Sequence, residues 1–143
     1  MTDANTMSVP NWYWIVAVLA VLWNLFGGFD YFNSVTVNEE YLASFGQEMI
    51  DFIKNMPMWA KAAWGIAIFS AIAGSVCLLL RNAWAFKLYV LAFIFMIISF
   101  AYQWTADDMP EVEGGTIMSV VVFAGAIFQI WFSRWANGNG WLK

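Results

Sequence analysis

Four long apolar segments, separated by polar links, dominate the pattern of hydrophobic and polar positions. They run over residues 12–31, 58–80, 84–104 and 115–135. Each is close to the length of about 20 residues that a helix needs to cross a hydrocarbon layer of roughly 30 Å. Because unpaired backbone groups are not tolerated in lipid, each segment predicts a membrane-spanning α-helix.

Aromatic residues at the segment ends support this interpretation. Trp12, Tyr13 and Trp14 open the first segment, and Trp131 and Trp135 close the last. Tryptophan and tyrosine concentrate at membrane–water interfaces because their rings are amphipathic. The first segment lacks a basic flank and a small-residue cleavage site, so we expect a retained span rather than a signal peptide.

The link between the first two spans has the period of an amphipathic helix over residues 38–55. Its apolar residues recur at helical spacing: Leu42, Phe45, Met49, Ile53 and Met56. Thr36 with Glu39 matches a capping box, and Pro57 follows the segment. We therefore expect a surface helix that lies with its apolar face on the mouth of the bundle.

Together these elements predict an all-α, integral membrane four-helix bundle, with an extra amphipathic surface helix between spans one and two and residues 1–143 forming a single domain. Composition agrees, since 62% of the residues are hydrophobic and 11% are charged, against about one quarter charged in soluble domains. The partner that covers so much apolar surface is the lipid bilayer.

Charge and residue usage narrow the function classes. The net charge is −4, which argues against nucleic acid, because binding its phosphates needs a basic patch. The chain has no histidine and one cysteine, Cys77, so imidazole-ligated metals, a histidine general base and an intramolecular disulfide are excluded. We expect no catalytic residue, no metal site and no cofactor.

The basic residues predict an orientation. Four of them flank the link between spans two and three or lie at or after the end of span four: Arg81, Lys87, Arg134 and Lys143. The link "TADDMPEVEG" carries four acids and no base. The positive-inside rule places both termini in the cytoplasm, with Arg81 and Arg134 as topology anchors, although Lys54 and Lys61 fall on the opposite side.

A few polar residues interrupt the spans, and each costs energy in hydrocarbon unless it meets a partner or water. Asn24, Asp30, Lys61 and Gln103 form a candidate polar site in the outer half of the bundle. The alternative is structural: Asn24 and Gln103 act as interhelical hydrogen-bond donors and acceptors, and Asp30 and Lys61 are solvated helix ends or an ion pair.

Small residues predict close helix packing. One set is the pair Gly27 and Gly28 in the first span, and the other follows span two: Ala63, Ala67, Ala71, Gly74 and Ser75. Small side chains let helix backbones approach closely in lipid, either within one bundle or between protomers. Gln129 and Ser133, four residues apart in the last span, are read as further packing contacts.

Two motifs carry a resemblance to a known group of proteins. "LWNLFGGFDY" and "NMPMWAKAAWGIAIFSAIAGSVCLLLRNAWA" resemble an uncharacterised family of small bacterial inner-membrane proteins with four spans and the patterns L-W-N-x-x-G-x-x-D-Y, M-P-x-W and L-L-L-R. The resemblance covers about residues 22–100, and some members carry the label "sugar transporter". It implies a multi-pass protein of the bacterial inner membrane, and gives Lys87 no family role because the stretch after Trp84 departs from the pattern.

Three function classes follow. A small-solute binding protein or transporter would use Asn24, Asp30 and Gln103 as its site. A structural or accessory subunit would assemble with itself, as a homo-oligomer, or with a membrane-protein partner. An intramembrane enzyme is the weakest, because Asp30 is the one acid within the spans. We expect a non-enzymatic protein that acts by solute binding or transport, with assembly as the alternative.

Overall fold

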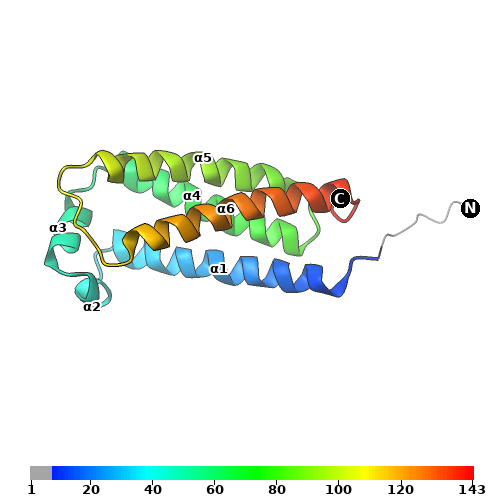
Figure 1. Cartoon of the computed structure of the whole chain (residues 1–143), viewed down its shortest axis with the longest axis horizontal. Helices are drawn as coiled ribbons and strands as arrows, with labels where there is room; N and C mark the ends of the chain where they lie inside the picture. The colour runs from blue at the N-terminus through cyan, green and yellow to red at the C-terminus, as the bar shows by residue number, and fades with distance from the viewer. Residues whose placement is uncertain (1–7) are drawn as a thin grey trace, which may run out of the picture.

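The computed structural model describes residues 8–143. Its frame is four long helices that run alternately up and down: α1 (Asn11–Val35), α4 (Met58–Leu79), α5 (Trp84–Thr105) and α6 (Gly115–Gly138). All four are long and apolar enough to cross a membrane. The chain is therefore an all-helical four-helix bundle, as the sequence predicts, and its described start and its C-terminus lie at the same end (Figure 1).

The helix boundaries follow from local chemistry. Pro10 and Pro57 precede α1 and α4 with φ of −65° and −64°, and proline suits a helix start because a backbone donor there has no partner within the helix. Gly114, with φ of 75°, precedes α6, in a left-handed conformation that glycine adopts without steric cost. The first and last helices continue beyond the predicted residues 31 and 135, to Val35 and Gly138.

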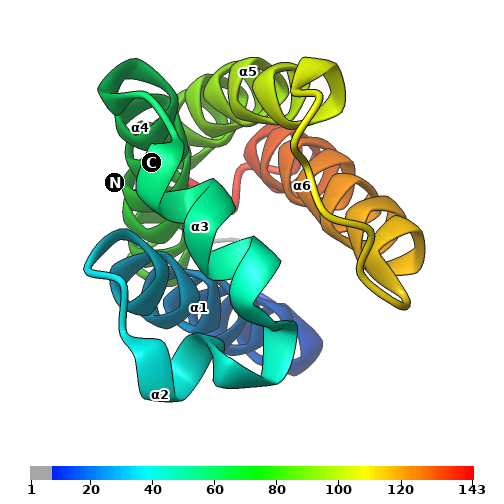
Figure 2. The ribbon, with the colours of Figure 1, turned by 90° about the vertical axis from the view of Figure 1, so that its left-hand side faces the viewer.

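The four long helices do not pack equally. Helix α4 packs most extensively against α5 and then against α1, whereas α6 joins mainly through α5. The buried residues of α6 all lie in its C-terminal half: Gln129, Phe132, Ser133 and Ala136. Figure 2 shows the N-terminal half of α6 standing away from α1.

Small residues make the tight α1–α4 and α4–α5 contacts. A Cβ on Gly28 would lie 3.0 Å from Ile72 Cδ1, and one on Gly27 would lie 3.3 Å from Ile68 Cδ1. On α4, Ala63, Ala67, Gly74 and Ser75 are buried and Ala71 is half-buried. These residues therefore pack within one bundle.

The predicted single surface helix over residues 38–55 is wrong in detail. The structure has α2 (Glu39–Leu42), a 3-10 turn (Ala43–Phe45) and α3 (Gln47–Asn55). The break falls at Gly46, whose φ is 91°, a conformation that a regular helix does not contain.

The predicted capping box is also wrong. Helix α1 extends far enough that Thr36 becomes its C-cap, and the Thr36 hydroxyl donates to Phe32 O (2.7 Å). The N-cap of α2 is instead Asn38, whose Oδ1 accepts from Tyr41 N (3.2 Å). An Asn side chain serves this purpose as well as Thr does.

The segment from Asn38, the N-cap of α2, to the end of α3 is called the cap below (residues 38–55), and it covers one end of the bundle (Figure 2). Its buried residues form a small core with the chain that follows: Leu42, Ile50, Phe52, Ile53, Met56 and Ala60. Phe52 stacks on Tyr102 of α5 at 6.0 Å between ring centroids. Because the helix breaks at Gly46, Phe45 of the predicted apolar face is exposed and Met49 is half-buried.

The C-terminal residues close the opposite end. Trp141 and Leu142 are buried in one cluster with Tyr13 and Phe132, and the Trp141 ring lies 4.9 Å from that of Trp135. Aromatic pairs at such distances add stability beyond the area that they bury. The burial of Trp141 and Leu142 was not predicted from the sequence.

Arg81 ties the C-terminal residues to the α4–α5 turn. Its Nε donates to Trp141 O (2.7 Å), its carbonyl accepts from Lys143 N (2.7 Å), and Ala83 N donates to Lys143 O (2.8 Å). Arg81 adopts a φ of 58°, which costs energy for a residue with a Cβ. It therefore has a structural role besides that of a charged anchor.

Gly74 gives the first prediction. An added Cβ would lie 3.1 Å from the Tyr89 ring and 3.4 Å from Ala85 O, and Tyr89 is held by a hydrogen bond to Ser75. Gly74→Ala should therefore lower the free energy of unfolding by about 1 to 3 kcal/mol through overpacking. Thermal unfolding in detergent checks this.

The matched control for that experiment is Gly125→Ala. Its Cβ would meet Trp23 Nε1 at an ordinary 3.7 Å, and alanine favours a helix interior over glycine, so the melting temperature should not fall below the wild-type value. Equal melting temperatures for both variants would contradict the packing that we describe.

Candidate functional site

All four long helices contribute one side chain to a single hydrogen-bonded cluster, called the polar centre below: Asn24 of α1, Ser75 of α4, Tyr89 of α5 and Gln129 of α6. Asn24 Nδ2 donates to Ser75 Oγ (2.6 Å) and to Gln129 Oε1 (3.1 Å). The hydroxyls of Ser75 and Tyr89 lie 2.9 Å apart. The polar centre therefore links every span to at least one other span.

The hydroxyl hydrogens of the polar centre have a consistent arrangement. Ser75 Oγ lies 2.9 Å from Ala71 O, one turn earlier on α4. Because a serine has one hydroxyl hydrogen and a carbonyl oxygen only accepts, Ser75 gives its hydrogen to Ala71. Ser75 then accepts from both Asn24 and Tyr89.

Burial increases the energetic importance of these hydrogen bonds. Ser75 is fully buried, Tyr89 is 2% exposed, and Asn24 and Gln129 are 9% and 7% exposed. A polar group in hydrocarbon without a partner costs several kcal/mol, and pairing it removes most of that cost. Within residues 8–143, every fully enclosed side-chain nitrogen or oxygen has a hydrogen-bond partner.

Two groups at the edge of the polar centre keep hydrogen-bonding capacity. Both amide hydrogens of Asn24 are used, but the side-chain hydrogen bonds of residues 8–143 include none to Asn24 Oδ1 or from Gln129 Nε2. Neither atom is fully enclosed, since none of the enclosed atoms lacks a partner. One amide oxygen on α1 and one amide N–H group on α6 therefore remain without a side-chain hydrogen bond among these residues.

The structure does not bring the four sequence-predicted site residues together. Asn24 belongs to the polar centre, whereas Asp30 Oδ1 accepts from the Tyr41 hydroxyl of the cap (2.7 Å). The half-buried Lys61 contributes its backbone carbonyl to the Tyr31 hydroxyl (3.1 Å). Gln103 is half-buried, and no hydrogen bond among residues 8–143 joins any two of the four.

Of the two structural alternatives for Asp30 and Lys61, the ion pair is not formed. Within the described residues the one ion pair is Lys54–Glu39, at 3.3 Å between exposed side chains. An exposed pair of this kind contributes about 1 kcal/mol or less. Lys54 thereby joins the two ends of the cap.

Sequence reasoning missed Tyr89 and gave Ser75 and Gln129 only a packing role. Tyr89 follows Trp84 closely in the chain, so it is easily taken for one more interfacial aromatic residue. The signal that distinguishes it is Gly74 on the facing helix, which gives its ring room. A polar aromatic residue opposite a glycine–serine pair is a pattern worth noting in membrane spans.

A second polar group fastens the cap to α1. Asn38 Nδ2 donates to Asn33 Oδ1 (2.8 Å), and Asn38 N donates to Asn33 O (2.8 Å). Burial, together with the hydrogen bond and the charge of Asp30, raises the pKa of Tyr41 to about 12.

Among residues 8–143, no group of three or more potential metal-ligating side chains is placed to hold a metal ion.

Comparisons with known proteins returned no match to this chain among protein-family models, curated proteins or solved structures.

The polar centre predicts a difference between two serines. Ser75→Ala removes a hydroxyl that bonds to Asn24 and Tyr89, and should lower the free energy of unfolding by about 1 to 2 kcal/mol. Ser119→Ala is the matched control, because the Ser119 hydroxyl bonds only to Gly115 O of its own helix (2.9 Å). Unfolding in detergent that fails to separate the two variants would contradict the role of the polar centre.

Tyr41 predicts a pH dependence of the cap. Its folded pKa lies above the ordinary value of 10.0, so its contribution to stability is complete below pH 10 and disappears as the pH rises through about 12. The tyrosinate absorbance of the wild type minus that of Tyr41→Phe should titrate near pH 12, and Asp30→Asn should move this midpoint toward 10. A midpoint near 10 in both backgrounds would show that Asp30 does not hold the hydroxyl.

Proposed function

We propose that this chain is a non-enzymatic, multi-pass membrane protein that acts by assembly, with a second copy or another membrane protein, rather than by carrying solute through its own bundle. The proposal is based on the hydrogen bonds and the burial of the Asn24 side chain. Both of its amide hydrogens bond to neighbouring helices, and the side chain is buried. The amide side chain in the apolar run of α1 is thus occupied in holding the helices together.

The hydrogen bonds of the polar centre do not suit a solute pathway. A solute pathway needs polar groups that water reaches and that can release one partner for another. In the polar centre, the bonds join α1 to α4, α1 to α6 and α4 to α5. Opening a path there would break bonds between spans, so structural use of the polar centre is favoured over transport.

One surface available for association is the N-terminal half of α6. Ile117, Val120 and Val121 are exposed, and no residue in that half is buried. Because α6 packs there mainly on α5, one face of it is left for lipid or for another helix. An accessory subunit with a rigid core and such a face fits this arrangement.

Small-solute binding is the second candidate, and one observation favours it. The side chains of Asn24 and Gln129 are hydrogen-bonded to each other, and Asn24 Oδ1 and Gln129 Nε2 keep spare hydrogen-bonding capacity. An amide oxygen and an amide N–H on neighbouring side chains suit a neutral solute that both donates and accepts, such as a polyol. The family resemblance, with some members labelled "sugar transporter", points the same way.

The proposed location is the bacterial inner membrane, with both termini in the cytoplasm. Nine of the ten acids lie in the cap, in the 106–114 link or at Asp30, at the end away from the C-terminus (Figure 1). Four of the six bases belong to the opposite end. The positive-inside rule assigns that basic end to the cytoplasm.

Cysteine labelling in intact cells separates the two candidates. In a Cys77→Ala background, Asn24→Cys should react with a membrane-impermeant thiol reagent at a small fraction of the rate of Asp108→Cys, which lies in the exposed acidic link. The reason is that position 24 is enclosed by the other spans. Ser119→Cys provides a comparison within α6.

Each alternative outcome has a definite meaning. Rapid reaction of Asn24→Cys that polyols slow would overturn the assembly proposal and establish solute binding. An unreactive Asp108→Cys alongside a reactive Asn139→Cys would overturn the proposed orientation.

A further inference from the structure

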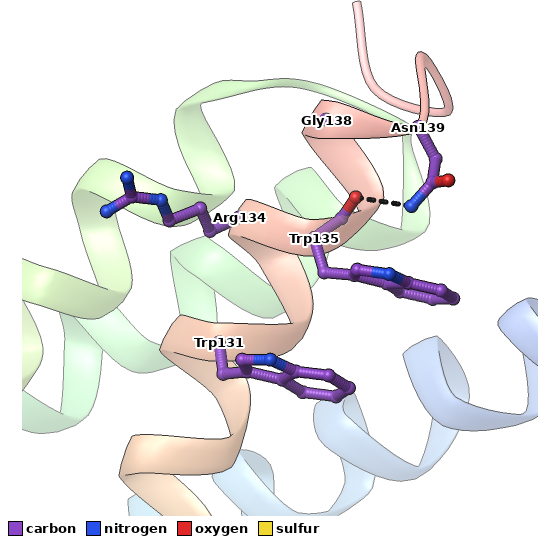
Figure 3. A pocket seen from close by; sticks show the side chains of 5 residues that line it. All are labelled: Trp131, Arg134, Trp135, Gly138 and Asn139. Carbon is purple, nitrogen blue, oxygen red and sulfur yellow. Dashed lines mark hydrogen bonds between the residues drawn. The ribbon is translucent and has the colours of Figure 1, made fainter.

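The basic end of the molecule carries a shallow, open surface hollow, called the cavity below, that the proposed function does not use. Its volume is about 490 Å³, and its lining comes from one face of the last turns of α6: Trp131, Arg134, Trp135, Gly138 and Asn139. Figure 3 shows the Arg134 side chain extending to one edge of this face and the two indoles to the other edge. A molecule in this cavity therefore meets a cation on one side and an aromatic surface on the other.

Arg134 is available to a ligand. Its side chain is exposed, and within residues 8–143 no hydrogen bond or ion pair engages its guanidinium, which rests over the Phe86 ring at 5.9 Å. Arg81 differs, because its Nε is bonded to Trp141 O. Arg134 thus keeps a planar fork of donors that matches a phosphate.

The rest of the cavity suits a lipid headgroup. Asn139 Nδ2 uses one hydrogen on Trp135 O (2.8 Å) and retains the other. Gly138 has open space where a side chain would stand. The ammonium of Lys87, on α5, lies 4.4 Å from the Trp84 ring centroid and is a second exposed cation at this end of the bundle.

We propose that this cavity binds an anionic phospholipid, with its phosphate on Arg134 and one acyl chain along α6. Arg134 lies four residues before the C-terminal end of α6. Because a helix rises about 1.5 Å per residue, Arg134 is roughly 6 Å from that end, where the helix would meet the membrane surface. Exposed Trp131, Phe128 and Ile127 continue from the cavity toward the middle of the helix. They give the acyl chain an apolar track.

Charge decides between an anionic and a zwitterionic lipid. The C-terminus of a helix carries a partial negative charge that opposes an anion by about 0.3 to 1 kcal/mol. A basic residue near a membrane surface attracts anionic lipid by about 1 kcal/mol, and both Arg134 and Lys87 contribute. The acids of residues 8–143 all lie at the other end of the molecule, so none of these offsets the attraction.

Native mass spectrometry of the purified full chain tests the proposal. Phosphatidylglycerol should bind more tightly than phosphatidylcholine, and Arg134→Gln should weaken phosphatidylglycerol binding about tenfold, the effect of losing one charge-assisted contact. Lys61→Gln is the matched control, since it removes one charge from the opposite end. Arg134→Lys, which keeps the charge but loses the fork, should fall between wild type and Arg134→Gln.

Three results would overturn the proposal. The first is an Arg134→Gln variant that binds phosphatidylglycerol as tightly as the wild type. The second is an equal loss of phosphatidylglycerol affinity in Arg134→Gln and Lys61→Gln. The third is a rise in melting temperature with inorganic phosphate that equals the rise with phosphatidylglycerol. The second would mean that net charge alone attracts lipid, and the third that the cavity takes free phosphate.

Discussion

The rest of this structure depends on one constraint: a polar group buried within membrane-spanning helices needs a partner from another helix or from its own backbone. Asn24 meets it by donating to Ser75 and Gln129, and Ser75 extends the connection to Tyr89. Each bond of this kind contributes only about 1 kcal/mol in a membrane, because unfolded spans also find partners in lipid. The larger effect of these hydrogen bonds is on which helix arrangement forms, since few arrangements satisfy the hydrogen bonds of all four side chains together.

The two ends of the bundle are closed by different means. The cap closes one end with a small apolar core and with hydrogen bonds from Asn38 and Tyr41 to α1. The other end is closed by Trp141 and Leu142, which the Arg81 backbone and side chain hold in place. Acids concentrate at the first end and bases at the second, so the closures also give the molecule an electrical polarity across the membrane.

The fold was accessible from sequence because span length and hydropathy act locally, and the four spans were predicted nearly to their observed ends. The cap was harder, since a single residue, Gly46, breaks a helical period that is otherwise continuous. The polar centre was reached only in part. Asn24 stands out as an amide in an apolar run, but its partners lie 51 and 105 residues away. No pattern along one chain specifies such pairing, and Tyr89 resembles an interfacial aromatic residue.

Asn24 and Ser75 act together to hold the spans. A double-mutant cycle with Asn24→Leu, Ser75→Ala and the combined variant, measured by unfolding in detergent or bicelles, would measure this cooperation. We expect a coupling energy of about 0.6 kcal/mol and no more than about 1.7 kcal/mol, the average and the maximum for hydrogen bonds between membrane helices. A coupling energy of zero, with each single variant as stable as wild type, would contradict it.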